Sequence, residues 1–476
     1  MDDDFSERTR SFLSWFQSRR SNISPKIQLA DLRYRNSGRG VVATQDIAQD
    51  EQLFSISRSD ILSVENSRFA HTEVGKSILA DLDDQWTPLI LVMIFEFLSG
   101  DDSQWKPYFD ILPTHFNSLM FWSDDELGQL QASAVRQKIG REEANEMFSE
   151  KIIPLVRRNT LALFLDASSI SDADLLYLAH RMGSTIMSYA FDLEKDPSQQ
   201  EVDEDGYASD EEEAFLPKGM IPLADMLNAD AGKNNARLFY EKSVVTMRAL
   251  KPIAAGEEIF NDYGPLPRAD LLRRYGYITQ GHAIYDVVEI PRQLVIDVFR
   301  ALAPDHPPQT SQEALVTLHC PKSEMTDASL ERKFEYLDEY EALDDGYDLS
   351  RSPDEGLIPA MLLSLIWTLD LSAADFDSKK DSKPRQASLD PKKKDSMRFF
   401  AVLCHIVEAR LNQYTTTLAD DEQLALVVEQ TALNDISEYR KAMALHVRIG
   451  EKQILHSALL QLTNARDEAI RKHGRD

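Results

Sequence analysis

The stretch from residue 220 to residue 278 constrains the fold most, because several uncommon features coincide within it. It opens with a short apolar segment that contains two polar residues, Asp225 and Asn228. The alternation of apolar and polar residues that follows predicts a hairpin between residues 238 and 247. This combination is typical of an active-site core. Two tyrosines followed by glycine come next in the stretch, Tyr263 and Tyr275.

A second feature is an internal similarity between two distant segments. Residues 43–54 and 249–260 carry the same amino acid at five positions, in the order Ala, Ile, Ala, Glu and Phe. Each segment predicts a strand, a tight turn and a second strand, with the turns at 49–50 and 255–256. We therefore expect two equivalent hairpins around one pocket, with the sequence between them as an insertion.

A glycine-rich loop precedes the first of these segments. Gly38 and Gly40 flank Arg39 just before a predicted strand. Glycine permits a ligand to approach the backbone closely, although the same pattern also fits a simple turn.

The glycine, asparagine and tyrosine motifs together resemble the SET domain, the fold of protein-lysine methyltransferases, in the branch that includes the Rubisco lysine methyltransferases. Asn228, Tyr263 and the run Tyr275, Gly276, Tyr277 match that branch, whereas Ala229 stands where the branch usually has histidine. The resemblance implies an α+β fold: a SET-domain β core of small sheets and hairpins with a large helical insertion, followed by an all-α C-terminal domain.

The resemblance also implies S-adenosylmethionine as the cofactor and gives roles to single residues. Asn228 would hold the cofactor through its side-chain amide, and Ala229 through its backbone. Tyr263 would orient the lysine amine and is the catalytic candidate. The residues assigned to the cofactor are Gly38, Arg39, Gly40, Tyr189, Asn228, Ala229, Tyr263 and Tyr275, and Asp225 is assigned to the substrate side of the cleft.

Domain boundaries are predicted where the patterns change. Residues 1–65 are expected to hold an N-terminal helix and the first part of the SET domain, 66–216 the helical insertion, 217–290 the second part with the active site, and 291–476 a helical domain resembling the substrate-binding domain of the branch. In the insertion, Pro88 begins an apolar helix that ends before Gly100. Further helices are predicted at 124–137, 142–153, 172–191, 356–371, 397–411 and 437–462.

Two charged segments interrupt these patterns. The acidic segment 194–213 is predicted to be a loop, either a solvated insert or an attractor for a lysine-rich substrate. The basic segment 378–396 is predicted to be a flexible loop, either a nuclear import signal or an ordinary basic loop. We expect a nuclear protein, with the cytoplasm as the alternative.

The composition of the chain limits the kinds of molecule that it is expected to bind. With 52 basic and 80 acidic residues, the net charge of −28 disfavours direct nucleic-acid binding and favours a basic protein substrate. Two distant cysteines cannot form a zinc cluster, so no metal is expected. The longest apolar run falls short of the ~20 residues that cross a bilayer, and the acidic start does not resemble a secretory signal, so no membrane association is expected.

These observations predict a protein-lysine N-methyltransferase. By resemblance, the expected substrate is a large-subunit ribosomal protein and the expected product is monomethyl-lysine. Two alternatives stay open: a catalytically silent SET-fold binding module, and a methyltransferase that acts on a non-ribosomal nuclear protein.

Overall fold

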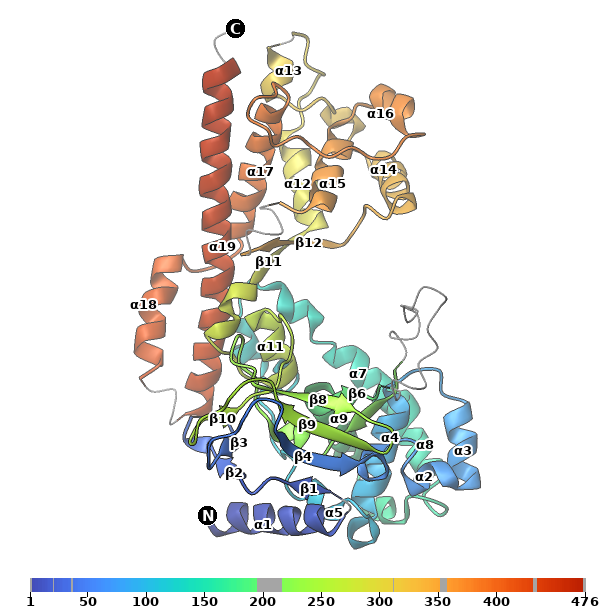
Figure 1. The fold of residues 1–476 in the computed structure, drawn as a ribbon. Coiled ribbons are helices and arrows are strands. Elements are labelled where there is room, and N and C mark those ends of the chain that lie inside the picture. Colours follow the sequence, from blue (N-terminus) through green and yellow to red (C-terminus); the bar gives the residue numbers. More distant parts are fainter. Residues whose placement is uncertain are drawn as a thin grey trace. The chain divides into compact units, whose positions relative to one another are not determined.

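The computed structural model describes residues 2–19, 21–35, 37–194, 216–310, 312–351, 358–430 and 435–473. The chain forms two compact units (Figure 1). The first comprises Met1–Trp122, Ile139–Pro265 and Asp270–Gly281, and the second Ser123–Lys138, Leu266–Ala269 and His282–Asp476. The domain boundaries predicted from the sequence rest on changes of pattern, whereas these units are defined by contacts, so the predicted boundaries remain predictions. The acidic segment 194–213, apart from its first residue, lies outside the described residues.

The first unit is built on small antiparallel sheets, as predicted. In its described part, the strand orders are β1-β4-β9-β8, β10-β3-β2 and β5-β7-β6. The strands are β1 (Asn22–Ile23), β2 (Ile27–Asp31), β3 (Arg39–Ala43), β4 (Gln52–Ser57), β5 (Leu62–Ser63), β6 (Ala190–Asp192), β7 (Lys218–Met220), β8 (Ala236–Tyr240), β9 (Val244–Ala249) and β10 (Glu258–Ile259). The predicted hairpin is confirmed as β8 and β9, where Leu238 pairs with Met247.

The two similar segments pair with each other, so the prediction of two separate hairpins is wrong. β3 pairs with β10 and β4 pairs with β9, which leaves each segment's own strands unpaired with one another. Residues 44–51 and 250–257 separate the strands within each segment, and a connection of that length does not force the tight pairing of a short hairpin.

The predicted turns are nevertheless equivalent. Asp50 and Gly256 both have positive φ, 63° and 89°. The amide of Ala48 donates to Glu51 Oε2 at 3.0 Å, and that of Ala254 donates to Glu257 Oε2 at 2.9 Å. Ile47 and Ile253 exchange backbone hydrogen bonds of 2.9 and 3.0 Å, which joins the two turns.

Helices cover the sheets of the first unit. They are α1 (Asp2–Ser18), α2 (Arg68–His71), α3 (Glu73–Ala80), α4 (Thr87–Leu98), α5 (Lys106–Phe109), α7 (Arg141–Met147), α8 (Ile153–Arg158), α9 (Asp172–Tyr189) and most of α11 (Arg268–Tyr275). The predicted apolar helix is α4, which lies buried in the core of the unit. Its one charged residue, Glu96, is also buried and accepts hydrogen bonds from Ser67 Oγ and Ser103 Oγ at 2.7 and 2.6 Å. The carboxylate is therefore tolerated, because both of its oxygens are paired.

The second unit is mainly helical, as predicted. Its elements are α6 (Asp124–Gly128), β11 (Val287–Pro291), α12 (Arg292–Leu302), α13 (Glu313–Val316), α14 (Asp327–Glu339), β12 (Gly346–Ser350), α15 (Ala360–Asp370), α16 (Ala373–Lys379), α17 (Ser396–Leu411), α18 (Leu418–Val428) and α19 (Ile436–His473). It also contains a two-stranded sheet, β11 with β12, which the all-α expectation omitted. Within the described part of the chain, no helix combines the length and apolar content that crossing a bilayer requires.

Two sequence expectations in the second unit need correction. The predicted helix 124–137 ends at Gly128, since the backbone turns at Gln131 with φ 51° before a short 3-10 turn at 134–138. The basic segment 378–396 is not simply a loose loop. Its Ala387 is buried and donates its amide to the carbonyl of Leu363 at 3.0 Å.

Candidate active site

The segment around Asn228 crosses the edge of the β core. Just before it, Leu223 has φ 76°, a strained conformation for a residue with a side chain. The carbonyl of Asn228 accepts a 2.9 Å hydrogen bond from the amide of Asn261, and Ala229 pairs with Asn261 in a parallel bridge. The segment is thereby fixed beside the chain that leads from β10 to Tyr263.

Asn228 also contacts the glycine loop. Its Nδ2 lies 2.8 Å from Glu258 Oε1 and 3.4 Å from the carbonyls of Ser37 and Arg39. A Cβ at position 40 would lie 2.3 Å from Leu32 Cδ1, 2.9 Å from Glu258 Oε1 and 3.0 Å from Asn228 Nδ2, so the ends of these side chains would have to shift. Gly38 has φ 59° and open space around it. The structure thus brings together the glycine loop and Asn228, which the sequence placed far apart.

The side chain of Arg39 is occupied elsewhere. Its guanidinium donates to Thr9 Oγ1 and to the carbonyl of Ile111, each at 3.1 Å, and stands 3.8 Å from the ring centre of Phe5. Burial lowers the pKa of Arg39 to about 10. The side chain of Arg39 is therefore not directed to a cofactor, and the role predicted for the main chain of this loop remains a prediction.

Three tyrosines form the centre of the site. The rings of Tyr263 and Tyr275 stack with centres 4.3 Å apart and an interplanar angle of 15°, and Tyr277 meets Tyr275 edge-on at 6.3 Å. The Tyr263 hydroxyl donates to the carbonyl of Leu227 at 3.1 Å, and the Tyr277 hydroxyl donates to that of Ala229 at 3.1 Å. Two tyrosines therefore hold the carbonyls on both sides of Asn228.

Burial determines the protonation of these tyrosines. It raises the pKa of Tyr263 well above its usual value, and the neighbouring tyrosines and Asp225 raise it further. Burial also raises the pKa of Tyr275. Tyr263 stays neutral at physiological pH and can act as a hydroxyl group, not as a phenolate base.

Asp225 lies buried beside the tyrosines. Its Oδ2 accepts a hydrogen bond from the hydroxyl of Tyr108, while its Oδ1 has no hydrogen-bond partner among the described residues. Burial raises the pKa of Asp225 to about 7. Burial and the charge of Asp225 raise the pKa of Tyr189 to about 12. A buried carboxyl group with one oxygen that accepts no side-chain hydrogen bond is suited to receive a hydrogen-bond donor.

Tyr189 is the last residue of α9, directly before β6. The preceding Ser188 donates through Oγ to the carbonyl of Arg274 at 2.6 Å, which ties this helix end to Tyr275. Gly276 has φ 75°, and a Cβ there would lie 2.5 Å from the amide nitrogen of Ser118. The end of α9, the Tyr275 helix and the segment before α6 are therefore closely packed.

Two residues of the site were not given a role from the sequence. Tyr277 appeared only within the motif, and Tyr108 was not singled out. Their hydrogen bonds reach partners 48 and 117 positions away, so local pattern gives no sign of them.

Comparison with known proteins supports the same interpretation. The SET domain family matches residues 38–264, and the family described as Rubisco LSMT substrate-binding matches residues 324–455. The chain is 39% identical to ribosomal lysine N-methyltransferase 4 of Saccharomyces cerevisiae over 306 residues, which cover 63% of this chain and 61% of that protein. It is 27% identical to N-lysine methyltransferase SETD6 of Homo sapiens over 468 residues, covering 94% of this chain and 89% of that protein.

Solved structures resemble the fold. A crystal structure of the SET domain of LSMT bound to lysine and AdoHcy matches with a TM-score of 0.67 at 18% identity, covering 98% of this chain and 93% of that chain. The structure of Rubisco LSMT bound to AdoMet matches with the same TM-score at 19% identity and equal coverage. At this identity the likeness establishes the fold alone.

Proposed function

We propose that the chain, whose residues 38–264 match the SET domain family and whose residues 324–455 match the Rubisco LSMT substrate-binding family, transfers a methyl group from S-adenosylmethionine to a lysine of a large-subunit ribosomal protein. The observation that carries the reaction type is the stacked pair Tyr263 and Tyr275 beside Asn228. The ribosomal substrate rests on the 39% identity to ribosomal lysine N-methyltransferase 4, of whose length 61% is matched.

The residues present fit this cofactor. Gly38 leaves open space, and Gly40 keeps the backbone close to Asn228 and Glu258. Asn228 offers an amide, and the Glu258 side chain, 7% exposed, also pairs with Arg35. These groups would hold the polar parts of the cofactor, and Tyr275 offers a flat face for stacking.

S-adenosylmethionine supplies a methyl group on a positively charged sulfur. The chain must present a neutral lysine amine in line with it, which costs about 4 to 5 kcal/mol for an ordinary lysine at neutral pH. Burial of the lysine beside Tyr263 would lower that cost, because desolvation disfavours the charged amine. The Tyr263 hydroxyl donates its hydrogen bond to the carbonyl of Leu227. The lone pairs of the hydroxyl oxygen are therefore left to accept weak hydrogen bonds from the methyl group and the amine.

The alanine at position 229 is compatible with this chemistry. Its backbone is held by the parallel bridge to Asn261, and its carbonyl accepts the hydroxyl of Tyr277. A histidine side chain is therefore not required to fix the main chain there. This argues for an active enzyme and against the silent binding module.

A second substrate class is a non-ribosomal nuclear protein. The similarity to SETD6, though lower in identity, extends over 94% of this chain and includes the C-terminal unit. One experiment distinguishes a ribosomal substrate from a non-ribosomal nuclear substrate. The purified chain is incubated with labelled S-adenosylmethionine and either ribosomes or a ribosome-free nuclear extract, both from cells that lack it. Labelled lysine in a large-subunit ribosomal protein is the expected result, and label confined to the nuclear extract would assign the second class.

We also propose that the chain acts in the nucleus. The exposed lysines of the basic segment, Lys392 and Lys393, are available to an import receptor. Replacing both by glutamine should shift a fluorescently tagged chain toward the cytoplasm. An unchanged distribution would show that Lys392 and Lys393 do not direct nuclear import.

A further inference from the structure

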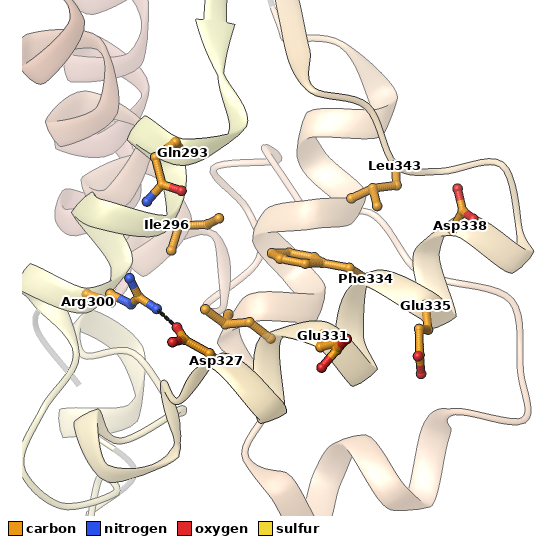
Figure 2. A pocket seen from close by; sticks show the side chains of 10 residues that line it. Gln293, Ile296, Arg300, Asp327, Glu331, Phe334, Glu335, Asp338 and Leu343 are labelled. Carbon is orange, nitrogen blue, oxygen red and sulfur yellow. Dashed lines mark hydrogen bonds and ion pairs between the residues drawn. The ribbon is translucent and has the colours of Figure 1, made fainter.

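The second unit contains a hollow between α12 and α14 that lies within that unit alone (Figure 2). Its volume is about 580 Å³. The floor is apolar and consists of Ile296, Leu330, Phe334 and Leu343. Figure 2 shows Phe334 in the middle, with Arg300 and Asp327 at one end and Asp338 at the other. We call this hollow the α12–α14 groove.

One face of α14 lines the groove with carboxylates. They follow one another at helical spacing and are all exposed: Asp327, Glu331, Glu335 and Asp338. Residues four apart on a helix are separated by ~6 Å along its axis. The opposite face of the same helix is buried and includes Lys333 and Leu337. The acidic row is therefore held in place by a helix that cannot rotate without exposing its apolar side.

The cations near the groove do not neutralise this row. Arg300 pairs with Asp327 at 2.5 Å. Arg292 stands over the Phe334 ring but pairs with Asp345 at 2.5 Å. Within the described ranges, Glu331, Glu335 and Asp338 form no ion pair, so the four lining carboxylates and one lining arginine leave three negative charges. An apolar floor beside unpaired carboxylates suits a ligand with cations and apolar side chains together.

We propose that the α12–α14 groove binds a segment of the protein substrate that is rich in lysine and arginine and also carries apolar side chains, separate from the lysine that is methylated. This proposal rests on the proposed function and names the chemistry of its substrate. Phosphate-bearing nucleic acid is repelled by the row, whereas a basic segment gains charge pairing at the rim and burial at the floor.

The test measures binding directly, with no cofactor present. The probe is a fluorescently labelled peptide of lysines interspersed with leucines, and its anisotropy is followed as the full-length chain is added. The groove variant is Glu331→Gln/Glu335→Gln/Asp338→Asn. The control variant, Glu339→Gln/Glu341→Gln/Asp305→Asn, removes the same charge from exposed positions of the same unit that do not line the groove.

The groove variant should bind the peptide roughly tenfold more weakly than the wild type at low salt, and the control variant should bind like the wild type. The difference should shrink at high salt, because exposed charges are screened. A peptide of lysines interspersed with serines should bind the wild type more weakly, since it cannot use the apolar floor. All substituted positions are exposed, so both variants should keep wild-type thermal stability.

Several results would overturn the proposal. They are equal affinities for the groove variant and the wild type, an equal loss in the control variant, and equal binding of the two peptides. A groove variant that changed the oligomeric state of the chain would assign the groove to a second copy instead. Because no methyl transfer is read, failure of this test leaves the proposed function standing. Absent methylation with intact peptide binding would reject the proposed function alone.

Discussion

Asn228 contributes to the site through one side-chain amide. It reaches Glu258 Oε1 at 2.8 Å and two carbonyls of the glycine loop at 3.4 Å, so its loss would leave these acceptors without a donor at the place where the cofactor is expected. Asn228→Ala should therefore weaken binding of S-adenosylmethionine by roughly tenfold in calorimetry. Asn234→Ala is the matched control, because within the described part of the chain the Asn234 side chain makes a single hydrogen bond, of 3.4 Å, to the exposed Asp262. A dissociation constant equal to that of the wild type would remove Asn228 from the cofactor site.

Asp225 links the site to pH. Burial raises its pKa from 3.8 to about 7 in the folded chain. The folded state then holds a proton that the unfolded state releases, so stability falls as pH rises through this window and is retained below it. Glu451 in the second unit, with a pKa raised by burial to about 7, adds to the same trend.

The Asp225→Asn variant keeps an acceptor for the Tyr108 hydroxyl but carries no charge. Its free energy of unfolding should therefore fall less between about pH 4 and about pH 7 than that of the wild type, by on the order of a few kcal/mol. Urea unfolding at both ends of this range measures the difference. Parallel pH profiles would show that Asp225 titrates normally in the folded chain.

Among the elements of the site, the glycine loop makes a demand on sequence that a substitution can test. A Cβ at position 40 would lie 2.3 Å from Leu32 Cδ1 and would press on both Glu258 and Asn228. Gly40→Ala should destabilise the chain by about 1 to 3 kcal/mol and weaken cofactor binding at the same time.

Gly128→Ala is its control, since a Cβ at that helix end has nothing within 4 Å. That variant should melt within a degree or two of the wild type, because surface changes of this kind cost little. If Gly40→Ala melted and bound cofactor like Gly128→Ala, the close approach described for the loop would be wrong.

The sequence was most informative where structure is local. Apolar periodicity and the proline at position 88 predicted α4, and alternation predicted β8 and β9. Strand pairing between distant segments could not be predicted from the sequence. The two similar segments form the same turns whether the strands pair within one segment or between the two segments, as they do here. The helix predicted at 124–137 failed for a related reason: its apolar spacing is helical, but the backbone reverses at Gln131.

The same limit applies to the site. The motifs identified Asn228 and the tyrosines at 263 and 275, and the structure places them together. The roles of Tyr108 and Tyr277 depend on a carboxylate and a carbonyl brought near by the fold, and no spacing rule predicts such partners. The roles of the individual site residues remain predictions that substitutions will decide.

For the whole molecule, the net charge is consistent with the basic protein substrate that we propose. A net charge of −28 gives the chain a long-range attraction for basic partners, which screening by salt weakens. Methylation of a whole basic protein should therefore slow as ionic strength rises, mainly through a higher KM. Methylation of a short neutral peptide that contains the same lysine should depend little on salt. If salt slowed the methylation of both substrates equally, the net charge of the chain would not contribute to substrate recognition.

We propose that this chain is a methyltransferase whose Tyr263 hydroxyl acts on the transferring methyl group and the amine. Mass spectrometry of the proposed ribosomal substrate after incubation with S-adenosylmethionine tests this role, with the wild type and Tyr263→Phe compared side by side. The wild type should add a single methyl group. The variant should be slower by about a hundredfold or more, although it keeps the ring that stacks on Tyr275 and binds the cofactor nearly as well. A wild-type chain that bound the cofactor but added no methyl group would not be a methyltransferase of this substrate, and a variant as fast as the wild type would remove Tyr263 from the reaction.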